Sequence, residues 1–368
     1  MNILYVCSKS LKDSQTGAAT QMRETCAALI KAGATIKRVF YSSNPIIYED
    51  DDGRLIFEKD LLQFVDESDV VHFIYCTRRI VRAWIKYHTK PFFGSTVFWS
   101  GRERVLVAWQ TYPKILERLK MVKYYAHFLV PKLQSFNGVD IFLPNTQAEG
   151  ERFLRSYRVD RNSYCFPVPN GFKVPSFDIS DVARIRGIPE CEYIVVPGIF
   201  ASRKNQLGLI RALKDSKYNV VFMGGVIAGN VDYYDACRRE ANERMHFIGY
   251  INSESKDYWS ILRHARCACL ASDCETPGVA MLEAAYAGAR PIITRFGGTV
   301  EYFGFDAEYL KPWSKKNIRN AVDQGWARGR LGQIESAQYA RYSWAYCAEM
   351  TLSAYKLGMS RFRMNDCL

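Results

Sequence analysis

The sequence has 368 residues and a mass of 42.3 kDa. One hydrophobic core rarely organises a chain of this length, so we expect two domains. A content of 48% hydrophobic and 24% charged residues is typical of a folded globular protein and excludes a disordered chain. The net charge is +12, and residues 77–132 hold twelve Lys or Arg against two Glu, a net charge of +10.

The basic segment 77–132 also contains aromatic residues, among them Trp84, Phe92 and Phe93. Cations and aromatic side chains at helical spacing are typical of a segment that lies on an anionic membrane surface. A solvated basic face on an ordinary amphipathic helix is the alternative explanation. The sequence contains no nucleic-acid-binding motif, so we do not expect nucleic acid as a partner.

We expect no signal peptide, because the first apolar run is only a few residues long, and the sequence contains no apolar run of membrane-spanning length. We therefore expect a cytoplasmic protein, which the basic segment would hold at the inner face of a membrane. The eleven cysteines form no C-x-x-C pair and have no His at zinc-finger spacing. We expect them to be reduced, mostly buried thiols.

Residues 1–170 are predicted to form a Rossmann-like domain on the acceptor side. The run NILYVCS predicts a strand, and QMRETCAALIKAGATIKRVFY predicts a helix that stops at Gly33 and then a second strand. Further strands are predicted over 69–75, 91–99 and 139–146, with helical patterns between them. This alternation favours an open parallel sheet covered by helices.

The stretch FPVPNGFKVPSF is rich in Pro and Gly, and we expect a hinge over 171–189. Over 190–345, continuous apolar strands such as YIVVPGIF and YNVVFMGG alternate with helical patterns such as NQLGLIRALKD. This pattern predicts a second doubly wound sheet. The helical pattern over 346–368 is long enough to return to the first domain.

The segment SDCETPGVAMLEAAYAG carries the strongest functional signal. Thr276 suits the N-cap of a helix and Pro277 its first position, while Gly278 and Val279 are small or narrow enough for a ligand to approach the backbone. Unpaired N–H groups at a helix start, with the helix dipole behind them, form an anion site.

Two glutamates accompany this helix start. Glu275 lies in the loop before the helix, and Glu283 lies two turns inside it. A carboxylate next to a phosphate-binding turn is unfavourable unless it accepts hydrogen bonds from hydroxyl groups, as it would from a sugar or a ribose. Two solvated glutamates on an ordinary helix are the alternative explanation.

The E-x7-E spacing of Glu275 and Glu283, followed by GARPIIT and GG, resembles the retaining glycosyltransferases of family 4, also called glycosyl transferases group 1. GIFASRKNQLGLIRAL, VVFMGG, MHFIGYI and SWAYCAEM extend the resemblance over residues 190–355. In the first half it rests on the Gly17-Ala18-Ala19 loop, LPNTQAE and VPNGF. The resemblance implies an α/β chain with the GT-B fold, in which two doubly wound Rossmann-like domains face each other across a cleft.

The resemblance also implies a function in polysaccharide biosynthesis: retaining transfer of a sugar from a nucleotide diphosphate sugar to a glycan or a lipid-linked saccharide. No cofactor and no metal are expected, because cations and helix N-termini stabilise the leaving diphosphate. The implied catalytic residues are Glu275, Lys204 and Arg203. The implied donor-binding residues are Gly17, Ala18, Asn205, Gly249, Tyr250, Thr276, Pro277, Gly278, Val279 and Glu283.

Within this set the resemblance implies distinct roles. Glu283 would accept the ribose hydroxyls, and Glu275 would hold hydroxyls of the donor sugar. Gly278 and Val279 would offer backbone N–H groups to the diphosphate, and the Gly17-Ala18 loop would close on it from the first domain. Lys204 would neutralise the leaving diphosphate, and Gly249 with Tyr250 would border the base.

The sequence departs from the family at two places. Ile199 follows Gly198 where the family usually has an Arg, and Arg203 is the expected substitute. The family often has a His after the strand that corresponds to PFFGSTVFW, whereas this chain continues SGRERV. His127 and His72 are candidate substitutes, although a lone His is more often structural.

Other functions remain open at this point. A dehydrogenase is disfavoured because no G-x-G-x-x-G follows the first strand. The acidic run EDDDG, which ends at Gly53, is better explained as a turn than as the metal site of a metal-dependent transferase. A non-hydrolysing nucleotide-sugar epimerase shares the two-domain architecture. A catalytically inert partner of another transferase fits the missing Arg.

Overall fold

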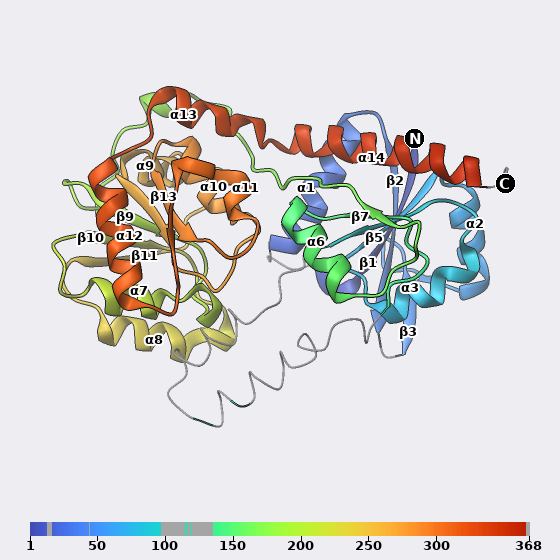
Figure 1. The fold of residues 1–368 in the computed structure, drawn as a ribbon, viewed down its shortest axis with the longest axis horizontal. Coiled ribbons are helices and arrows are strands. Elements are labelled where there is room, and N and C mark those ends of the chain that lie inside the picture. The colour runs from blue at the N-terminus through green and yellow to red at the C-terminus, as the bar shows by residue number, and fades with distance from the viewer. Residues whose placement is uncertain (13–16, 44, 97–114, 116–118, 120–134, 366–368) are drawn as a thin grey trace. The chain divides into compact units, whose positions relative to one another are not determined.

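The computed structural model describes residues 1–12, 17–43, 45–96, 115, 119 and 135–365 (Figure 1). The described residues form two units. The first unit contains residues 1–96, 135–171 and 342–365, and the second contains residues 172–341. The expected hinge 171–189 is thus divided, since its contacts place residues 172–189 in the second unit. The cleft between the two domains stays a prediction.

The first unit contains an eight-stranded sheet in the order β4-β3-β2-β1-β5-β6-β7-β8. The neighbours β2, β1, β5, β6, β7 and β8 pair in parallel. β3 and β4 add an antiparallel edge that the sequence did not predict. The strands are β1 (Asn2–Ser8), β2 (Thr35–Ser43), β3 (Ile46–Glu49), β4 (Leu55–Ile56), β5 (Val70–Ile74), β6 (Phe92–Ser95), β7 (Ile141–Leu143) and β8 (Tyr164–Cys165).

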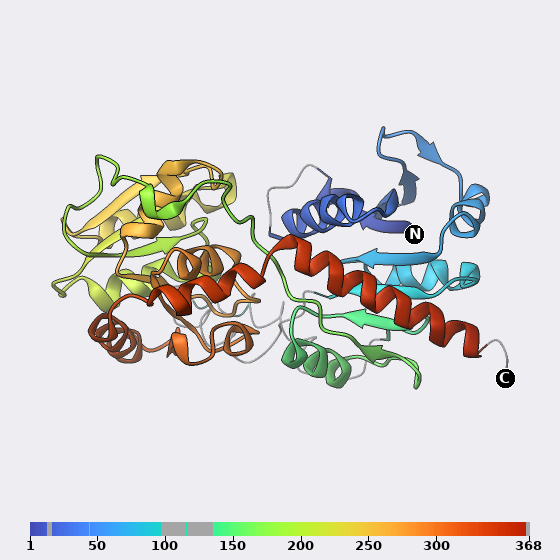
Figure 2. The same cartoon turned by 90° about the horizontal axis from the view of Figure 1, so that it is seen from above.

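The helices of the first unit include one from the far end of the chain. They are α1 (Gly17–Lys31), α2 (Leu61–Asp66), α3 (Arg78–Trp84), α6 (Gln147–Ser156) and α14 (Trp344–Asn365). Gly33 takes a φ of +88° just after α1, which only glycine adopts without strain, and this turn ends the helix as predicted. α14 packs against α1, and Figure 2 shows it as the long helix that crosses the first unit.

The second unit contains a six-stranded, fully parallel sheet in the order β11-β10-β9-β12-β13-β14. Every residue of β9 and β12 is buried, which explains why these strands are continuously apolar. The strands are β9 (Tyr193–Pro197), β10 (Asn219–Met223), β11 (Met245–Gly249), β12 (Cys267–Leu270), β13 (Arg290–Thr294) and β14 (Glu308–Leu310). The α/β class with two doubly wound sheets is confirmed.

Seven α-helices are described in the second unit. They are α7 (Gln206–Leu213), α8 (Val231–Glu240), α9 (Lys256–His264), α10 (Val279–Tyr286), α11 (Thr299–Phe303), α12 (Lys315–Arg328) and α13 (Gln333–Ala337). Side-chain caps mark two of these starts: Ser255 accepts a hydrogen bond from the amide of Tyr258, and Ser314 accepts one from the amide of Asn317.

The aromatic residues that the sequence suggested for a membrane surface are partly core residues. Trp84, Phe92 and Phe93 are fully buried in the first unit, so they are not available to a membrane. Most of the basic segment, from residue 97 onward, lies outside the described residues. None of the described helices is long and apolar enough to cross a membrane.

Two smaller expectations concern the cysteines and the acidic run. The ten described cysteines are free thiols, and seven of them are buried, as predicted. The run that ends at Gly53 forms the turn between β3 and β4, in which Asp50 accepts a hydrogen bond from the amide of Arg54 at 2.8 Å. The described residues contain no group of three or more His, Cys, Asp or Glu side chains that could hold a metal ion.

Candidate donor site

The candidate site lies in the second unit, at the carboxyl ends of β9 and β12, where ligands bind in open parallel sheets. The chain after β9 passes close to the end of β10. A Cβ atom added at Gly224 would lie 1.9 Å from the carbonyl oxygen of Gly198, which takes a φ of +124°. Glycine at both positions lets the loop that carries Ile199, Arg203 and Lys204 leave the sheet here.

An ion pair joins this loop to the loop after β12. Lys204 Nζ lies 2.5 Å from Glu275 Oε1, and their side chains are 11% and 7% exposed. The Ser272 hydroxyl donates a hydrogen bond to the same oxygen at 2.5 Å. Burial raises the pKa of Glu275, but Lys204, Arg203 and Ser272 together outweigh it, so that the pKa falls below its ordinary value. Glu275 is therefore an ionised acceptor.

The other basic-loop residues have different surroundings. Arg203 is exposed, and its carbonyl accepts a hydrogen bond from the amide of Asp273 at 2.9 Å. Asn205 takes a left-handed φ of 54° and is 3% exposed. Its side-chain nitrogen donates to the carbonyls of Ala271 and Pro312 at 3.1 and 2.8 Å. Asn205 thus fixes the loop, a structural role that the donor-binding prediction did not include.

The start of α10 differs from the prediction. The helix begins at Val279 with Gly278 as its N-cap, and a cis peptide bond joins Thr276 to Pro277. Gly278 has φ 81° and ψ 84°, which are not helical values, so neither Thr276 nor Pro277 can be the N-cap or the first residue. Among the described residues, no acceptor is found for the amides of Gly278 and Val279.

The helix start lies next to the ion pair. A Cβ atom added at Gly278 would lie 3.4 Å from Glu275 Oε2, the carboxylate oxygen that Lys204 does not hold. The backbone of Glu275 is itself fixed, since its carbonyl accepts from the amide of Gly298 and its amide donates to Phe296. Gly297 passes so close that an added Cβ would lie 1.8 Å from the Glu275 carbonyl oxygen.

Glu283 is the second buried carboxyl group of the site. It is 7% exposed, and the Tyr258 hydroxyl on α9 donates a hydrogen bond to its Oε2. Burial raises the pKa of Glu283 to about 7, although the Tyr258 bond acts in the opposite direction. The carboxyl group of Glu283 therefore changes charge near neutral pH. A ligand hydroxyl that donates a hydrogen bond to it would favour its ionised form.

The two residues predicted to border the base, Gly249 and Tyr250, lie at the edge of the sheet. Gly249 ends β11 with a φ of +77°, and Tyr250 is 75% exposed. The Gly249 carbonyl accepts a hydrogen bond from the amide of Gly224 at 2.8 Å, which links this strand end to the loop after β10. An exposed ring at the carboxyl end of the sheet can stack on a base.

The remaining predicted residues lie in the first unit. Gly17 and Ala18 begin α1. His72 is a core residue: its ring nitrogens bond to Tyr355 at 2.6 Å and Ser95 at 2.8 Å, and burial lowers its pKa to about 3. A catalytic His72 is wrong, because a 1% exposed neutral ring has both nitrogens occupied. His127 lies outside the described residues.

Sequence reasoning missed three residues that hold the two glutamates: Tyr258, Ser272 and Gly297. Ser272 begins the segment SDCETPGVAMLEAAYAG, three residues before Glu275, so its spacing was a usable signal. Tyr258 lies 25 residues before Glu283 on another helix, and only the packing of α9 on α10 brings them together.

Residues 181–324 match the family model described as Glycosyl transferases group 1, a range that contains Lys204, Glu275 and Glu283. The chain carries a group 1 glycosyltransferase domain. The predicted resemblance to this retaining family, and with it the prediction of a glycosyltransferase, is confirmed. No curated protein matches the sequence.

Several solved structures resemble the glycosyltransferase over its whole length. They include a glycosyltransferase from Rickettsia africae (15% identity over 97% of this chain and 98% of the other, TM-score 0.66). They also include sucrose-phosphate synthase from Thermosynechococcus elongatus (16%, 99% and 98%, 0.59) and Anabaena HepE in complex with UDP-glucose (14%, 99% and 100%, 0.57). At these identities the similarity establishes the fold, and the predicted GT-B fold is confirmed.

Proposed function

We propose that this glycosyltransferase moves a sugar, with retention, from a nucleotide diphosphate sugar to a glycan or a lipid-linked saccharide. The observation that carries the proposal is the buried pair of Lys204 and Glu275 beside the start of α10. A cation, a helix N-terminus and an ionised carboxylate suit the diphosphate and the sugar hydroxyls of one ligand. The likeness to HepE, which was solved with UDP-glucose, supports a nucleotide sugar as the donor.

Each group has a defined task in the proposed reaction. The amides of Gly278 and Val279 bind the diphosphate, and Lys204 neutralises the charge that grows on it as the sugar leaves. Groups placed where negative charge develops stabilise the transition state more than the ground state, and this accelerates the transfer. Glu275 accepts hydrogen bonds from the sugar, and Glu283 accepts them from the ribose. With Lys204 and the helix amides in these roles, we propose a metal-independent reaction.

Nucleotide binding by the unmodified chain tests the proposal. A ligand that binds only the folded protein raises its melting temperature. We expect UDP, GDP, ADP or dTDP at millimolar concentration to raise Tm by several degrees, and Lys204→Met to abolish most of the shift. No shift with any of the four would contradict a nucleotide diphosphate donor. Release of nucleoside diphosphate from a nucleotide sugar in the presence of EDTA tests the proposed independence of metal.

Catalytic inertness is the second candidate function, and Ile199 is the observation that favours it. Its side chain is 36% exposed at the place where the family usually has an Arg. Slow release of nucleoside diphosphate from a panel of nucleotide sugars distinguishes the two: an inert partner releases none. Conversion of a nucleotide sugar to its epimer, without any acceptor and without release of nucleoside diphosphate, would instead indicate an epimerase.

We also propose a cytoplasmic location at an anionic membrane, on the charge of residues 77–132. Twelve cations in this segment favour acidic lipids. Sedimentation with phosphatidylglycerol vesicles at low salt tests this, and a protein that stays in the supernatant contradicts it.

A further inference from the structure

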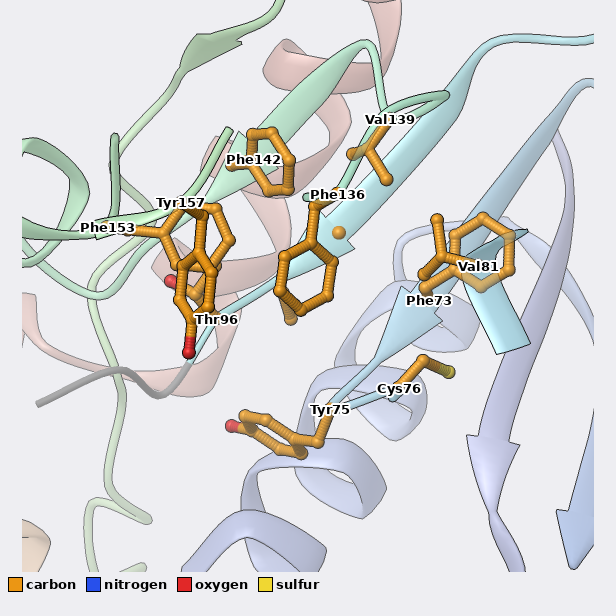
Figure 3. A pocket seen from close by; sticks show the side chains of 12 residues that line it. Phe73, Tyr75, Cys76, Val81, Thr96, Phe136, Val139, Phe142, Phe153 and Tyr157 are labelled. Atoms are coloured by element: carbon orange, nitrogen blue, oxygen red, sulfur yellow. The ribbon is translucent and has the colours of Figure 1, made fainter. Parts of the chain in front are cut away.

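The first unit contains a cavity of about 210 Å³, shown in Figure 3. Its apolar wall is formed by Phe73, Val81, Phe136, Phe142, Phe153 and Tyr157, and we call it the aromatic pocket. Tyr75 and Ser95, at the ends of β5 and β6, also line it, which places it at the carboxyl edge of the sheet. Ligands of open α/β sheets bind at this edge.

The wall of the aromatic pocket is a packed set of rings. The Phe136 ring lies 5.4 Å from that of Phe153 and 5.0 Å from that of Tyr157, and the Phe142 and Phe153 rings are 4.7 Å apart. These contacts hold the wall in place without filling the space beside it. A cavity of about 150 Å³ lined by apolar side chains accepts a benzene molecule. The aromatic pocket is larger, so it has room for a short hydrocarbon chain.

A second hollow, of about 690 Å³, lies beside the first. Arg78, Arg79 and Arg82 line it, and it shares Val81 and Phe136 with the aromatic pocket. We call it the arginine groove. No acidic side chain is among the described residues that line it. Arg78 and Arg82 are exposed and have no carboxylate partner in the described part of the chain.

The two hollows are electrostatically connected. Burial raises the pKa of Tyr157 in the pocket wall, and the charge of Arg78 in the groove acts against that rise. A ligand that lay across Val81 and Phe136 would therefore meet hydrocarbon on one side and guanidinium groups on the other. Arginine binds phosphate and carboxylate oxygens through two parallel hydrogen bonds. Three guanidinium groups around one hollow suit the higher charge of a phosphate.

We propose that the acceptor of this glycosyltransferase carries a phosphate next to an apolar chain, with the chain in the aromatic pocket and the phosphate in the arginine groove. This inference rests on the proposed function and specifies its acceptor as a saccharide linked through phosphate to a lipid. A neutral glycan would use neither the hydrocarbon wall nor the cations. The pocket takes the first part of the chain, and the groove fixes the head that carries the sugar.

Binding of short soluble amphiphiles to the full chain, without nucleotide, tests the inference by isothermal titration calorimetry. We expect geranyl phosphate to bind with one-to-one stoichiometry and more than tenfold more tightly than ethyl phosphate, geraniol or inorganic phosphate. Each methylene-sized group that is buried strengthens binding about fourfold. Affinity that does not change from ethyl through hexyl to geranyl phosphate would overturn the assignment of the pocket, and this series needs no mutant.

The arginine groove is tested with a double variant and a matched control. The double variant Arg78→Gln with Arg82→Gln should lower the affinity for geranyl phosphate to that for geraniol. Lys31→Gln with Arg161→Gln removes two exposed cations elsewhere in the same unit and should leave the affinity within twofold. Equal losses in both double variants would mean that only net charge matters, which contradicts the groove.

Two further outcomes separate the possible explanations. Binding to phosphatidylglycerol vesicles with no binding of any soluble alkyl phosphate would overturn the inference in favour of a membrane contact. A protein that is stabilised by a nucleoside diphosphate but does not bind geranyl phosphate retains the proposed function and loses this acceptor. A protein that binds geranyl phosphate but no nucleotide contradicts the proposed function instead.

Discussion

Lys204 Nζ and Glu275 Oε1 lie 2.5 Å apart in a nearly buried ion pair that joins the loops after β9 and β12. The pair leaves Glu275 Oε2 facing the backbone of Gly278 at the start of α10. This arrangement brings a cation, a carboxylate and a helix start into one small region. Lys204 and Gly278, which mark its two ends in the sequence, are 74 positions apart.

Replacing Lys204 by Met should destabilise the protein and reduce its activity. The variant leaves a buried carboxylate without its cation, which costs about 3 kcal/mol of unfolding free energy. Loss of a group that stabilises the leaving diphosphate should lower kcat about 100-fold or more. Urea denaturation and nucleotide-sugar turnover measure the two effects.

A control variant tests whether burial is the cause of that loss. Lys173 and Glu254 lie at the same distance, 2.5 Å, but their side chains are 62% and 61% exposed. Lys173→Met should therefore cost less than about 1 kcal/mol. The double variant Lys204→Met with Glu275→Gln should recover most of the stability but none of the activity. Losses that simply add would show that the two side chains are not coupled.

Nucleotide affinity should rise with pH up to about 7. Ribose hydroxyls donate to the charged form of Glu283, whose pKa in the free protein is raised to about 7 by burial. Binding therefore releases a proton below this pH, and the affinity levels off above it. Calorimetry in two buffers of different ionisation enthalpy measures the released proton. Glu283→Gln should bind weakly with a flat profile, and a flat profile in the unmodified protein would exclude Glu283 from the nucleotide site.

Tyr258→Phe should move that pH profile upward. The Tyr258 hydroxyl donates to Glu283 and lowers the pKa of its carboxyl group, so the pKa rises when the hydroxyl is removed. The pH at which nucleotide affinity levels off should shift to a higher value, while affinity well above that pH changes little. Tyr286→Phe on α10 is the control and should leave the profile in place. The same shift in both variants would mean that Tyr258 acts through packing alone.

Gly297→Ala should unfold or displace the loop that holds Glu275. An added Cβ would lie 1.8 Å from the Glu275 carbonyl oxygen, and the φ of +117° is itself strained for alanine. Gly187→Ala separates the two effects, because Gly187 has a φ of +86° but no atom within 4 Å of the added Cβ. We expect about 1 kcal/mol for Gly187→Ala and at least twice that for Gly297→Ala. Equal melting temperatures for the two variants would contradict the close contact.

The stabilities of the two units should respond to acid in opposite directions. His72 has a pKa of about 3 in the folded first unit against 6.5 in a free side chain, so this unit loses stability as the pH falls below 6.5. Glu283 has a pKa of about 7 against 4.5, so the second unit gains stability as the pH falls from 7 to 4.5. Between pH 7 and 5 each effect amounts to about 2 kcal/mol.

Hydrogen exchange resolved by peptide measures this difference. After correction for the intrinsic rate, β5 should be less protected at pH 5 than at pH 7, and α10 should be more protected. His72→Phe should remove the change in the first unit only. Parallel changes in both units would contradict the assignment to these two residues.

Strands and long helices were predictable because their patterns are local. The apolar runs that form β1, β5, β9 and β12 predict strands from their own residues alone, and Gly33 predicts the end of α1. The antiparallel edge of β3 and β4 was missed because these strands, of four and two residues, are too short to show a recognisable alternation of apolar and polar residues.

The site was predictable in its residues but not in its geometry. Glu275, Glu283 and Lys204 came from spacing and resemblance, and the structure places Lys204 on Glu275. Thr276 and Pro277 carry good signals for a helix start, yet the φ of Gly278 moves the start to Val279. The partners of the glutamates depend on packing between distant elements, which no local pattern encodes.

The contribution of α14 to the first unit has a consequence for biosynthesis. Tyr355 on this helix bonds to His72 and Tyr5 in the core, and Gly358 packs so closely on Phe93 that an added Cβ would lie 2.3 Å away. The first unit therefore cannot close its interior until α14 has left the ribosome. The second unit, which is translated later than most of the first, holds all its own strands and can reach its native state sooner. Until then, the apolar surface that α14 covers would be open to chaperones.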